Sequence, residues 1–163
     1  MADWNNTVAV VRRSIHVRAA PARVWKEFEN FDRMQQWWGA VTGPHEAGSG
    51  NGQKLMVYDA REGGRIEMEV LFQGKPLRYG GPIVAFEPGR ELTFESDWIP
   101  NQGWAVPTYI TIRLRDSLGG TLVEILHHGF ERTGKNWRDE HAAYEGGWGM
   151  TQLKALQSIL AAA

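Results

Sequence analysis

Hydrophobic and polar residues alternate along the middle of the chain. In residues 91–98 the even positions (Leu, Phe, Ser, Trp) share one face and the odd positions (Glu, Thr, Glu, Asp) share the other. A period of two is typical of a β-strand with one buried and one solvated face. Similar segments, several of them bounded by glycine-containing turns, predict six to seven strands. The segments are residues 7–18, 53–60, 64–73, 77–88, 90–98, 109–116 and 121–130.

Apolar residues recur at helical spacing in three other places. Residues 21–30 begin with Pro21, which suits the first position of a helix, and predict a short amphipathic helix. Residues 31–38 repeat the pattern, with Asp32 as the expected N-cap. Residues 136–163 contain no proline and predict a long C-terminal helix, about 40 Å long if continuous.

Three glycines, Gly146, Gly147 and Gly149, fall inside this C-terminal helix. Each costs roughly 1 kcal/mol relative to alanine at a helical position. We therefore expect a structural reason for them, either close approach of the helix backbone to the sheet or a kink above a cavity.

The order of elements predicts an α+β fold in one domain that spans residues 1–163. One strand and two short helices precede a run of antiparallel strands, and only the last helix is long enough to cover the apolar face of the sheet. A curved sheet wrapped around that helix leaves a concave centre, which only large side chains can fill.

Composition and charge exclude several classes of function. The chain has 163 residues, of which 42% are hydrophobic and 23% charged, as in ordinary globular domains. Its net charge of −1 and the absence of runs of like charge argue against nucleic-acid binding. The lack of cysteine removes disulfides, thiolate nucleophiles and cysteine-ligated metals. No apolar run approaches the roughly 18 residues of a membrane span, so we expect a cytoplasmic protein without membrane insertion.

Six short motifs occur in order between residues 10 and 160. They are AAPARVWKEF, WW, GGRIEMEV, YGGPIVAFEPGRELTFESDW, GTLVEILHHGF and EGGWGMTQLKAL. Together they resemble the activator-of-heat-shock-protein-90-ATPase homologue group of the START-like (SRPBCC) superfamily. The resemblance implies the helix-grip fold of the birch-pollen allergen, with an apolar cavity between sheet and C-terminal helix. Superfamily members include lipid and polyketide binders, cyclases and self-resistance proteins, so the resemblance transfers fold better than function.

Two adjacent histidines, His127 and His128, fall near the end of the last predicted strand. Neighbouring side chains of a strand point to opposite faces, and the parity of Val123 and Ile125 places His127 inside. Glu124 falls on the other face, so it cannot form a dyad with His127. We interpret His127 as a polar handle for a ligand or a general acid–base. The alternative is a buried histidine satisfied by a backbone carbonyl.

His141, Tyr144 and Glu145 share one face of the predicted C-terminal helix. Two helical ligands without a third convergent group make a poor metal site, so we predict no bound metal. Tyr144 is the exception in this group, because its hydroxyl could reach into the cavity.

Large apolar and aromatic side chains supply the expected cavity lining. The predicted ligand-binding residues are Trp38, Phe86, Phe94, Trp98, Trp104, Ile112, His127, Tyr144 and Trp148. Eight tryptophans in so short a chain suggest a shaped aromatic space, although tryptophan also fills a core on its own. Residues 99–107 either form a mobile rim of the cavity or serve as a long connection.

The sequence therefore favours a protein that binds, sequesters or presents a hydrophobic, aromatic or polycyclic small molecule. We expect no cofactor and a monomer or homodimer, with His127, Tyr144 and either Arg65 or Arg113 orienting the ligand. The first alternative is a cyclase-, aromatase- or hydrolase-type enzyme that uses His127 as acid–base and Tyr144 as proton donor. The second is a co-chaperone-like interaction module, which requires a large exposed apolar patch. The resemblance leaves natural-product biosynthesis or self-resistance open as the setting.

Overall fold

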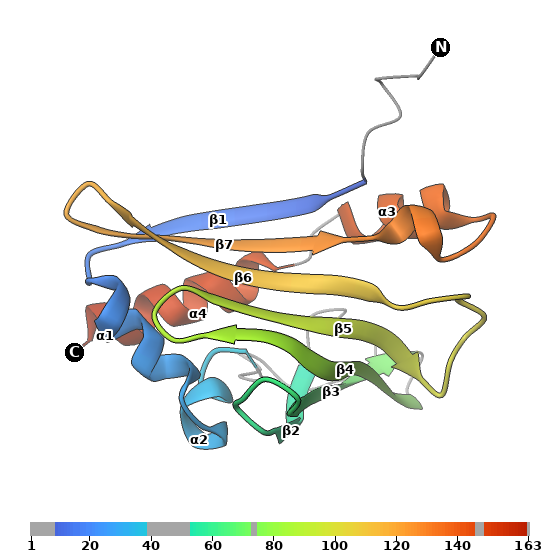
Figure 1. Ribbon diagram of the computed structural model, residues 1–163, viewed down its shortest axis with the longest axis horizontal. Coiled ribbons are helices and arrows are strands. Elements are labelled where there is room, and N and C mark those ends of the chain that lie inside the picture. Colours follow the sequence, from blue (N-terminus) through green and yellow to red (C-terminus); the bar gives the residue numbers. More distant parts are fainter. Residues whose placement is uncertain (1–8, 39–52, 73–74, 146–148, 163) are drawn as a thin grey trace, which may run out of the picture.

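The computed structural model has the predicted order of elements (Figure 1). It describes residues 9–38, 53–72, 75–145 and 149–162. The elements are β1 (Val11–Val17), α1 (Pro21–Trp25), η1 (Lys26–Phe28), α2 (Phe31–Met34), β2 (Gln53–Tyr58), β3 (Arg65–Phe72), β4 (Lys75–Glu87), β5 (Glu91–Ile99), β6 (Thr108–Ser117), β7 (Gly120–His128), η2 (Phe130–Arg132), α3 (Trp137–Glu145) and α4 (Met150–Ala161). The predicted α+β helix-grip arrangement is confirmed.

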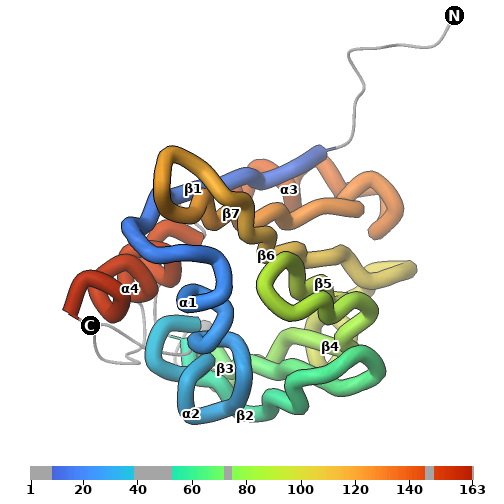
Figure 2. Tube along the Cα trace, turned by 60° about the vertical axis from the view of Figure 1, so that its left-hand side comes forward, coloured from blue at the N-terminus to red at the C-terminus, as the bar shows by residue number. Residues whose placement is uncertain are grey.

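The seven strands form one antiparallel sheet in the order β1-β7-β6-β5-β4-β3-β2. The sheet curls into a half-barrel, and Figure 2 shows α4 beside its open side. The short helices α1 and α2 lie at one end of the half-barrel, and α3 lies at the other end (Figure 1). The concave face is thus covered by helix, as its apolar side chains require.

Strand register separates an inner face from an outer face. Ile110 of β6 lies opposite Phe94 of β5 and His127 of β7, and all three side chains are buried. The odd positions of β6 face outward instead, where Arg113 lies opposite Glu124. From α4, Leu153, Ala155 and Leu156 pack into the same core as the inner face of the strands. Alternation in the sequence therefore corresponds to the two faces of the sheet.

The C-terminal segment forms two helices rather than one continuous helix. α3 ends at Glu145 and α4 begins at Met150, preceded by Gly149 with a φ of +99°. A Cβ atom at Gly149 would lie 3.2 Å from Cγ of Arg13 on β1. The break in the helix and a close approach to the sheet thus occur together at this glycine, and that close approach is one of the two reasons expected from the sequence.

The two helices differ in how they are packed. No residue of α3 is fully buried, and Trp137 and Tyr144 pack partly against a small second cluster of Ala9, Val11 and Phe130. In contrast, α4 contributes to the main core. α4 is therefore the helix gripped by the sheet, and α3 closes one end of it.

The short helices after β1 are confirmed, but the predicted cap of the second one is wrong. The side chain of Asn30, not Asp32, accepts a hydrogen bond from the Arg33 amide at 2.9 Å. Asp32 lies two residues after the N-cap, in the first turn of the helix, where a carboxylate interacts favourably with the helix dipole.

Three residues singled out in the sequence, Gly146, Gly147 and Trp148, lie outside the described residues. Within the ranges that the structure describes, no helix is both long and apolar enough to cross a membrane.

Candidate functional site

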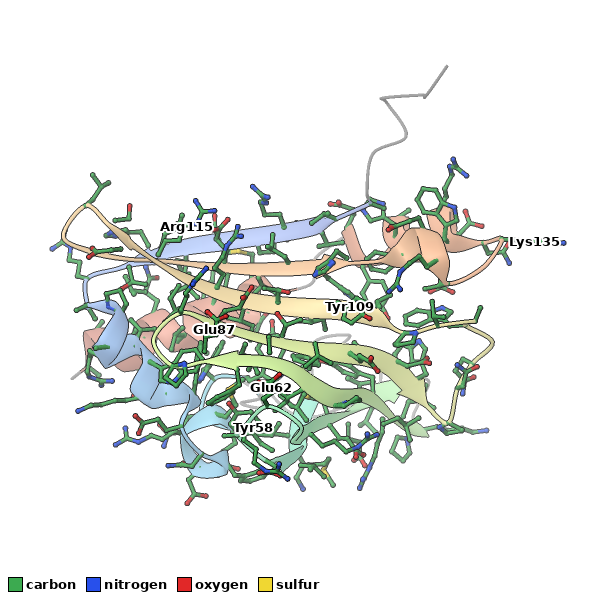
Figure 3. All side chains as sticks on the ribbon, viewed as in Figure 1. Tyr58, Glu62, Glu87, Tyr109, Arg115 and Lys135 are labelled. Atoms are coloured by element: carbon green, nitrogen blue, oxygen red, sulfur yellow. The ribbon has the colours of Figure 1, made fainter. Side chains whose placement is uncertain are left out.

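A group of buried polar and aromatic side chains lies where β7 ends and α3 covers the sheet. His127 belongs to it, with only 1% of its surface exposed on the inner face. In Figure 3, Tyr109 of β6 and Lys135, which precedes α3, mark this end of the molecule, and Arg115 marks the other end of β6. We call this group the His127 cluster and define it as Thr108, His127, Phe130 and Tyr144.

Hydrogen bonds fix the tautomer of His127. The Thr108 hydroxyl donates its single hydrogen to the Ser96 carbonyl oxygen at 2.9 Å. The same hydroxyl oxygen lies 2.7 Å from Nε2 of His127, so that nitrogen must be the donor. His127 therefore carries its proton on Nε2 and a lone pair on Nδ1. The alternative expected from the sequence was a buried histidine satisfied by a backbone carbonyl; the ring is buried, and it reaches the Ser96 carbonyl through the Thr108 hydroxyl.

Burial keeps this imidazole neutral. Loss of hydration lowers the pKa of His127 to about 3, and the nearby His128 and His141 lower the pKa further. At neutral pH the ring is therefore uncharged and a weak proton acceptor. A general acid–base would need a pKa much closer to the working pH.

Aromatic rings enclose the imidazole. The ring centroid of His127 lies 4.5 Å from that of Phe130 and 4.8 Å from that of Tyr144, the latter edge-on. Phe130 in turn contacts Tyr144 at 5.4 Å and His141 at 5.5 Å. These contacts join β7 to α3, the two elements on either side of η2.

Tyr144 is partly buried in this cluster. Burial raises the pKa of its phenol, and the carboxylates of Glu140 and Asp97 raise the pKa further. The hydroxyl is thus protonated at any physiological pH. Among the described residues, no hydrogen bond involves the Tyr144 hydroxyl.

A second buried polar chain lies deeper in the half-barrel. The Tyr79 hydroxyl donates to Oε1 of Gln53, and Nε2 of Gln53 donates to the backbone carbonyl of Trp38. Burial and the nearby Tyr144 raise the pKa of Tyr79. The charge state of Tyr79 on β4 is thus affected by Tyr144 of the His127 cluster.

The remaining predicted lining residues fall into different surroundings. Trp38, Phe94 and Ile112 are fully buried in the main core, where the rings of Trp38 and Phe94 meet edge-on at 6.2 Å. Trp98 packs edge-on against Tyr79 at 5.9 Å and is therefore near the second polar chain. Phe86 instead contacts Trp25 of α1 at 5.2 Å.

Residue 99 still belongs to β5, and residues 100–107, which include the partly buried Trp104, form the connection between β5 and β6. Asn101 holds this connection with bonds from Nδ2 to Asp97 Oδ2 at 2.9 Å and to the Trp104 carbonyl at 3.0 Å. The Ala105 amide donates to the carbonyl of Thr133 at 2.8 Å. These bonds join the connection to the segment between η2 and α3, beside the His127 cluster.

The expected role of Arg65 or Arg113 in orienting an internal ligand is wrong. Both arginines lie on the outer face: Arg65 Nε is 2.6 Å from Glu67 Oε2, and Arg113 Nη2 is 3.2 Å from Glu124 Oε1. Their positions follow from parity, because their strand neighbours Ile66 and Ile112 face the core.

His141 and Glu145 form an ion-pair geometry on α3, with 3.1 Å between Nε2 and Oε1. Within the described part of the chain, no group of three or more histidine or acidic side chains could hold a metal ion.

Sequence reasoning missed Thr108 and Phe130 of the His127 cluster, and Tyr79 and Gln53 of the second polar chain. Thr108 shares parity with Ile110 and lies in the same sheet as His127, but its pairing depends on strand register. Tyr79 and Gln53 come from β4 and β2, and only the curl of the sheet brings them together. An alternation pattern places each of them on the inner face but cannot pair them.

Comparison with known proteins supports the fold. A family model described as activator of Hsp90 ATPase homolog 1-like protein matches residues 18–161. No curated protein matches the chain. Among solved structures, protein CV1439 from Chromobacterium violaceum has 23% identity and a TM-score of 0.67, with 93% of this chain and 96% of that chain covered.

Two further solved structures share the fold. DynU16, a protein in the dynemicin biosynthetic locus, has 16% identity and a TM-score of 0.59 over 94% of this chain and 47% of that chain. The Aha1 dimer from Colwellia psychrerythraea has 14% identity and a TM-score of 0.56 over 93% of this chain and 95% of that chain. Similarity at these identities establishes the fold alone.

Proposed function

Since the chain belongs to the activator of Hsp90 ATPase homolog 1-like family, we propose that it binds a hydrophobic, aromatic or polycyclic small molecule between the sheet and the C-terminal helices. Family membership alone is compatible with a ligand-binding domain or with a co-chaperone-like domain. The His127 cluster favours the ligand-binding role. It combines a neutral imidazole in one tautomer, aromatic rings and a phenol within one buried group.

The observation that carries this proposal is the Tyr144 ring packed edge-on against His127 at 4.8 Å, with a hydroxyl that makes no hydrogen bond within the described residues. A partly buried hydroxyl costs free energy if it has neither a protein partner nor water. Polar groups set among aromatic rings are the usual means by which a protein orients an apolar ligand. DynU16, in a natural-product biosynthetic locus, shares the fold, and we propose biosynthesis or self-resistance as the setting to test first.

The enzyme alternative is less well supported by the same residues. With a pKa of about 3, His127 accepts a proton poorly at neutral pH. A raised pKa makes Tyr144 a hydrogen-bond donor rather than an acid in proton transfer. Both groups suit binding better than acid–base chemistry.

The interaction-module alternative needs a continuous apolar surface. Among the described residues, the large apolar side chains that are exposed are Val84 of β4, at 40%, and Leu118 in the β6–β7 turn, at 94%. Two side chains on separate strands and turns do not make such a surface, so we rank this alternative below ligand binding.

Titration with polycyclic and fatty ligands tests the proposal. We expect a saturable change in tryptophan emission together with a rise in Tm that grows with ligand concentration. The emission change should be much smaller in Trp98→Phe, which lacks the indole beside Tyr79. It should persist in Trp25→Phe, a matched variant on α1. The proposal is overturned if no ligand of the panel changes either emission or Tm.

A further inference from the structure

The charges around the His127 cluster indicate what kind of ligand it accepts. The arginine of η2, beside the cluster, is engaged on the outer face: Nη2 of Arg132 donates to the Pro107 carbonyl at 3.2 Å, and its guanidinium carbon lies 5.0 Å from the centre of the Tyr109 ring. On the helix side of β1, Arg13 donates to the Glu145 carbonyl at 2.6 Å and to the Arg12 carbonyl at 2.9 Å. These cations already have acceptors, so none of them is placed to neutralise an internal anion.

Carboxylates, in contrast, act on the cluster itself. Glu140 lies one helical turn before Tyr144 on α3, and Asp97 of β5 directly follows Ser96, whose carbonyl accepts the Thr108 hydrogen bond; both carboxylates raise the pKa of Tyr144. Asp97 keeps its place through bonds to the Trp98 amide at 2.7 Å and the Asn101 side chain at 2.9 Å. A third negative charge near Tyr144 would be repelled by both carboxylates, and the neutral His127 would not offset that repulsion.

Tyr144 supplies the matching hydrogen-bond donor. Its hydroxyl keeps its proton, and the edge-on contact with His127 at 4.8 Å holds the ring in the cluster. An uncharged acceptor oxygen on a ligand would satisfy this donor without adding charge. The Thr108 hydroxyl already donates to the Ser96 carbonyl and accepts from His127. The Tyr144 hydroxyl is therefore the donor in this cluster that a ligand could engage.

We infer that the ligand is an uncharged ring compound whose carbonyl, quinone or ether oxygen accepts a hydrogen bond from Tyr144, and that carboxylate-bearing ligands are rejected. This inference rests on the proposed binding function and specifies the ligand class for the same site.

Three probes with one ring system separate the parts of the inference: fluorene, fluorenone and the carboxylate of fluorene, each titrated calorimetrically. We expect fluorenone to bind about fivefold more tightly than fluorene, as one neutral hydrogen bond of about 1 kcal/mol would give. We expect the carboxylate to bind at least about tenfold more weakly than fluorene, because it adds a charge to an uncompensated site.

Tyr144→Phe should bind fluorenone and fluorene equally. Tyr109→Phe is the matched control, because Tyr109 lies at the same end of the molecule but on the outer face, stacked on His128 at 5.7 Å. It should retain the fivefold preference. A thermal unfolding curve for each variant shows that it remains folded.

The outcomes distinguish this inference from the function on which it rests. Equal binding of fluorenone and fluorene by the unaltered protein, or a preference that survives in Tyr144→Phe, overturns the role of Tyr144 and leaves ligand binding intact. Carboxylate binding as tight as that of fluorene overturns the charge argument. Failure of all three probes to bind rejects the ligand class, and failure of the wider panel of fatty and polycyclic compounds as well rejects the proposed function.

Discussion

The indole nitrogen of Trp37 donates a hydrogen bond to the backbone carbonyl oxygen of Glu27 at 3.0 Å. Both residues are fully buried, and the Trp37 ring stacks on Phe28 at 5.0 Å. This bond ties the segment after α2 to η1. It also satisfies a carbonyl that has no access to water, which is the reason that a tryptophan suits this position.

We expect Trp37→Phe to lower the free energy of unfolding by about 2–4 kcal/mol, because it removes ring volume and leaves the Glu27 carbonyl unsatisfied. Urea denaturation measures the loss. Trp25→Phe is the control: Trp25 is also buried, but within the described residues its indole nitrogen makes no hydrogen bond. It should cost at least about 1 kcal/mol less, and equal losses in the two variants would contradict the role of the bond.

The side chain of Glu27 is the second buried group in this region. Its Oε1 lies 2.9 Å from Nη1 of Arg23 and 3.3 Å from Nη1 of Arg33, while the carboxylate itself has no exposed surface. Replacing both arginines with methionine would leave a buried charge without a partner. We expect a loss of about 3 kcal/mol, at the lower end for buried pairs because both arginines are partly exposed.

Adding Glu27→Gln to that double variant should recover at least half of the lost stability, since the amide carries no charge to desolvate. Urea denaturation of the double and triple variants at neutral pH measures the recovery. A triple variant less stable than the double variant would show that Glu27 contributes chiefly through something other than these two ion pairs.

The sheet could be predicted from the sequence because each strand has one wet face. The segment 90–98, for example, corresponds to β5 at Glu91–Ile99. Parity also places His127 inside, and the same parity argument, applied to Arg113 beside Ile112, would have placed that arginine outside. The sequence therefore contains enough information to place Arg113 on the outer face.

The chemistry of the site could not be predicted in the same way. Alternation assigns a face to Thr108 and to His127, but their contact depends on which residue of β6 lies opposite which residue of β7. The contact of Tyr144 with His127 depends on the break before α4, since a continuous helix would direct α3 elsewhere. Contacts between elements depend on how the elements pack, and the hydrophobic periodicity of the sequence does not specify that packing.

Gly149 occupies a backbone conformation that an L-residue adopts at a cost. We expect Gly149→Ala to lower stability by about 2 kcal/mol, through the positive φ of +99° and through the 3.2 Å approach of the new Cβ to Arg13 Cγ. Gly119→Ala is the matched control, because Gly119 has a φ of +75° with no atom within 4 Å of the position of the new Cβ. Both variants place alanine at a positive φ, but only at Gly149 do atoms of Arg13 and Ile125 lie within 4 Å of the new Cβ, so equal losses of stability would contradict the crowding argument.

The buried imidazole of His127 makes stability depend on pH. The pKa of an unperturbed histidine is 6.5, whereas burial lowers the pKa of His127 to about 3 in the folded protein. Between these values the unfolded chain binds a proton that the folded chain does not, so stability falls as the pH falls below 6.5. From pH 7 to pH 5 the expected loss is about 2 kcal/mol, at roughly 1.4 kcal/mol for each pH unit below 6.5.

Urea denaturation at pH 7 and pH 5 measures this loss. His127→Gln should lack most of it, because an amide can donate to Thr108 as Nε2 does but does not titrate. His128→Gln is the control: partial burial also lowers the pKa of His128, but Glu131 and Glu91 oppose that shift, so its removal should leave most of the pH dependence in place. If His127→Gln and the unaltered protein lose equal stability on acidification, other groups cause the loss. Such a result would contradict the conclusion that His127 is neutral in the folded protein.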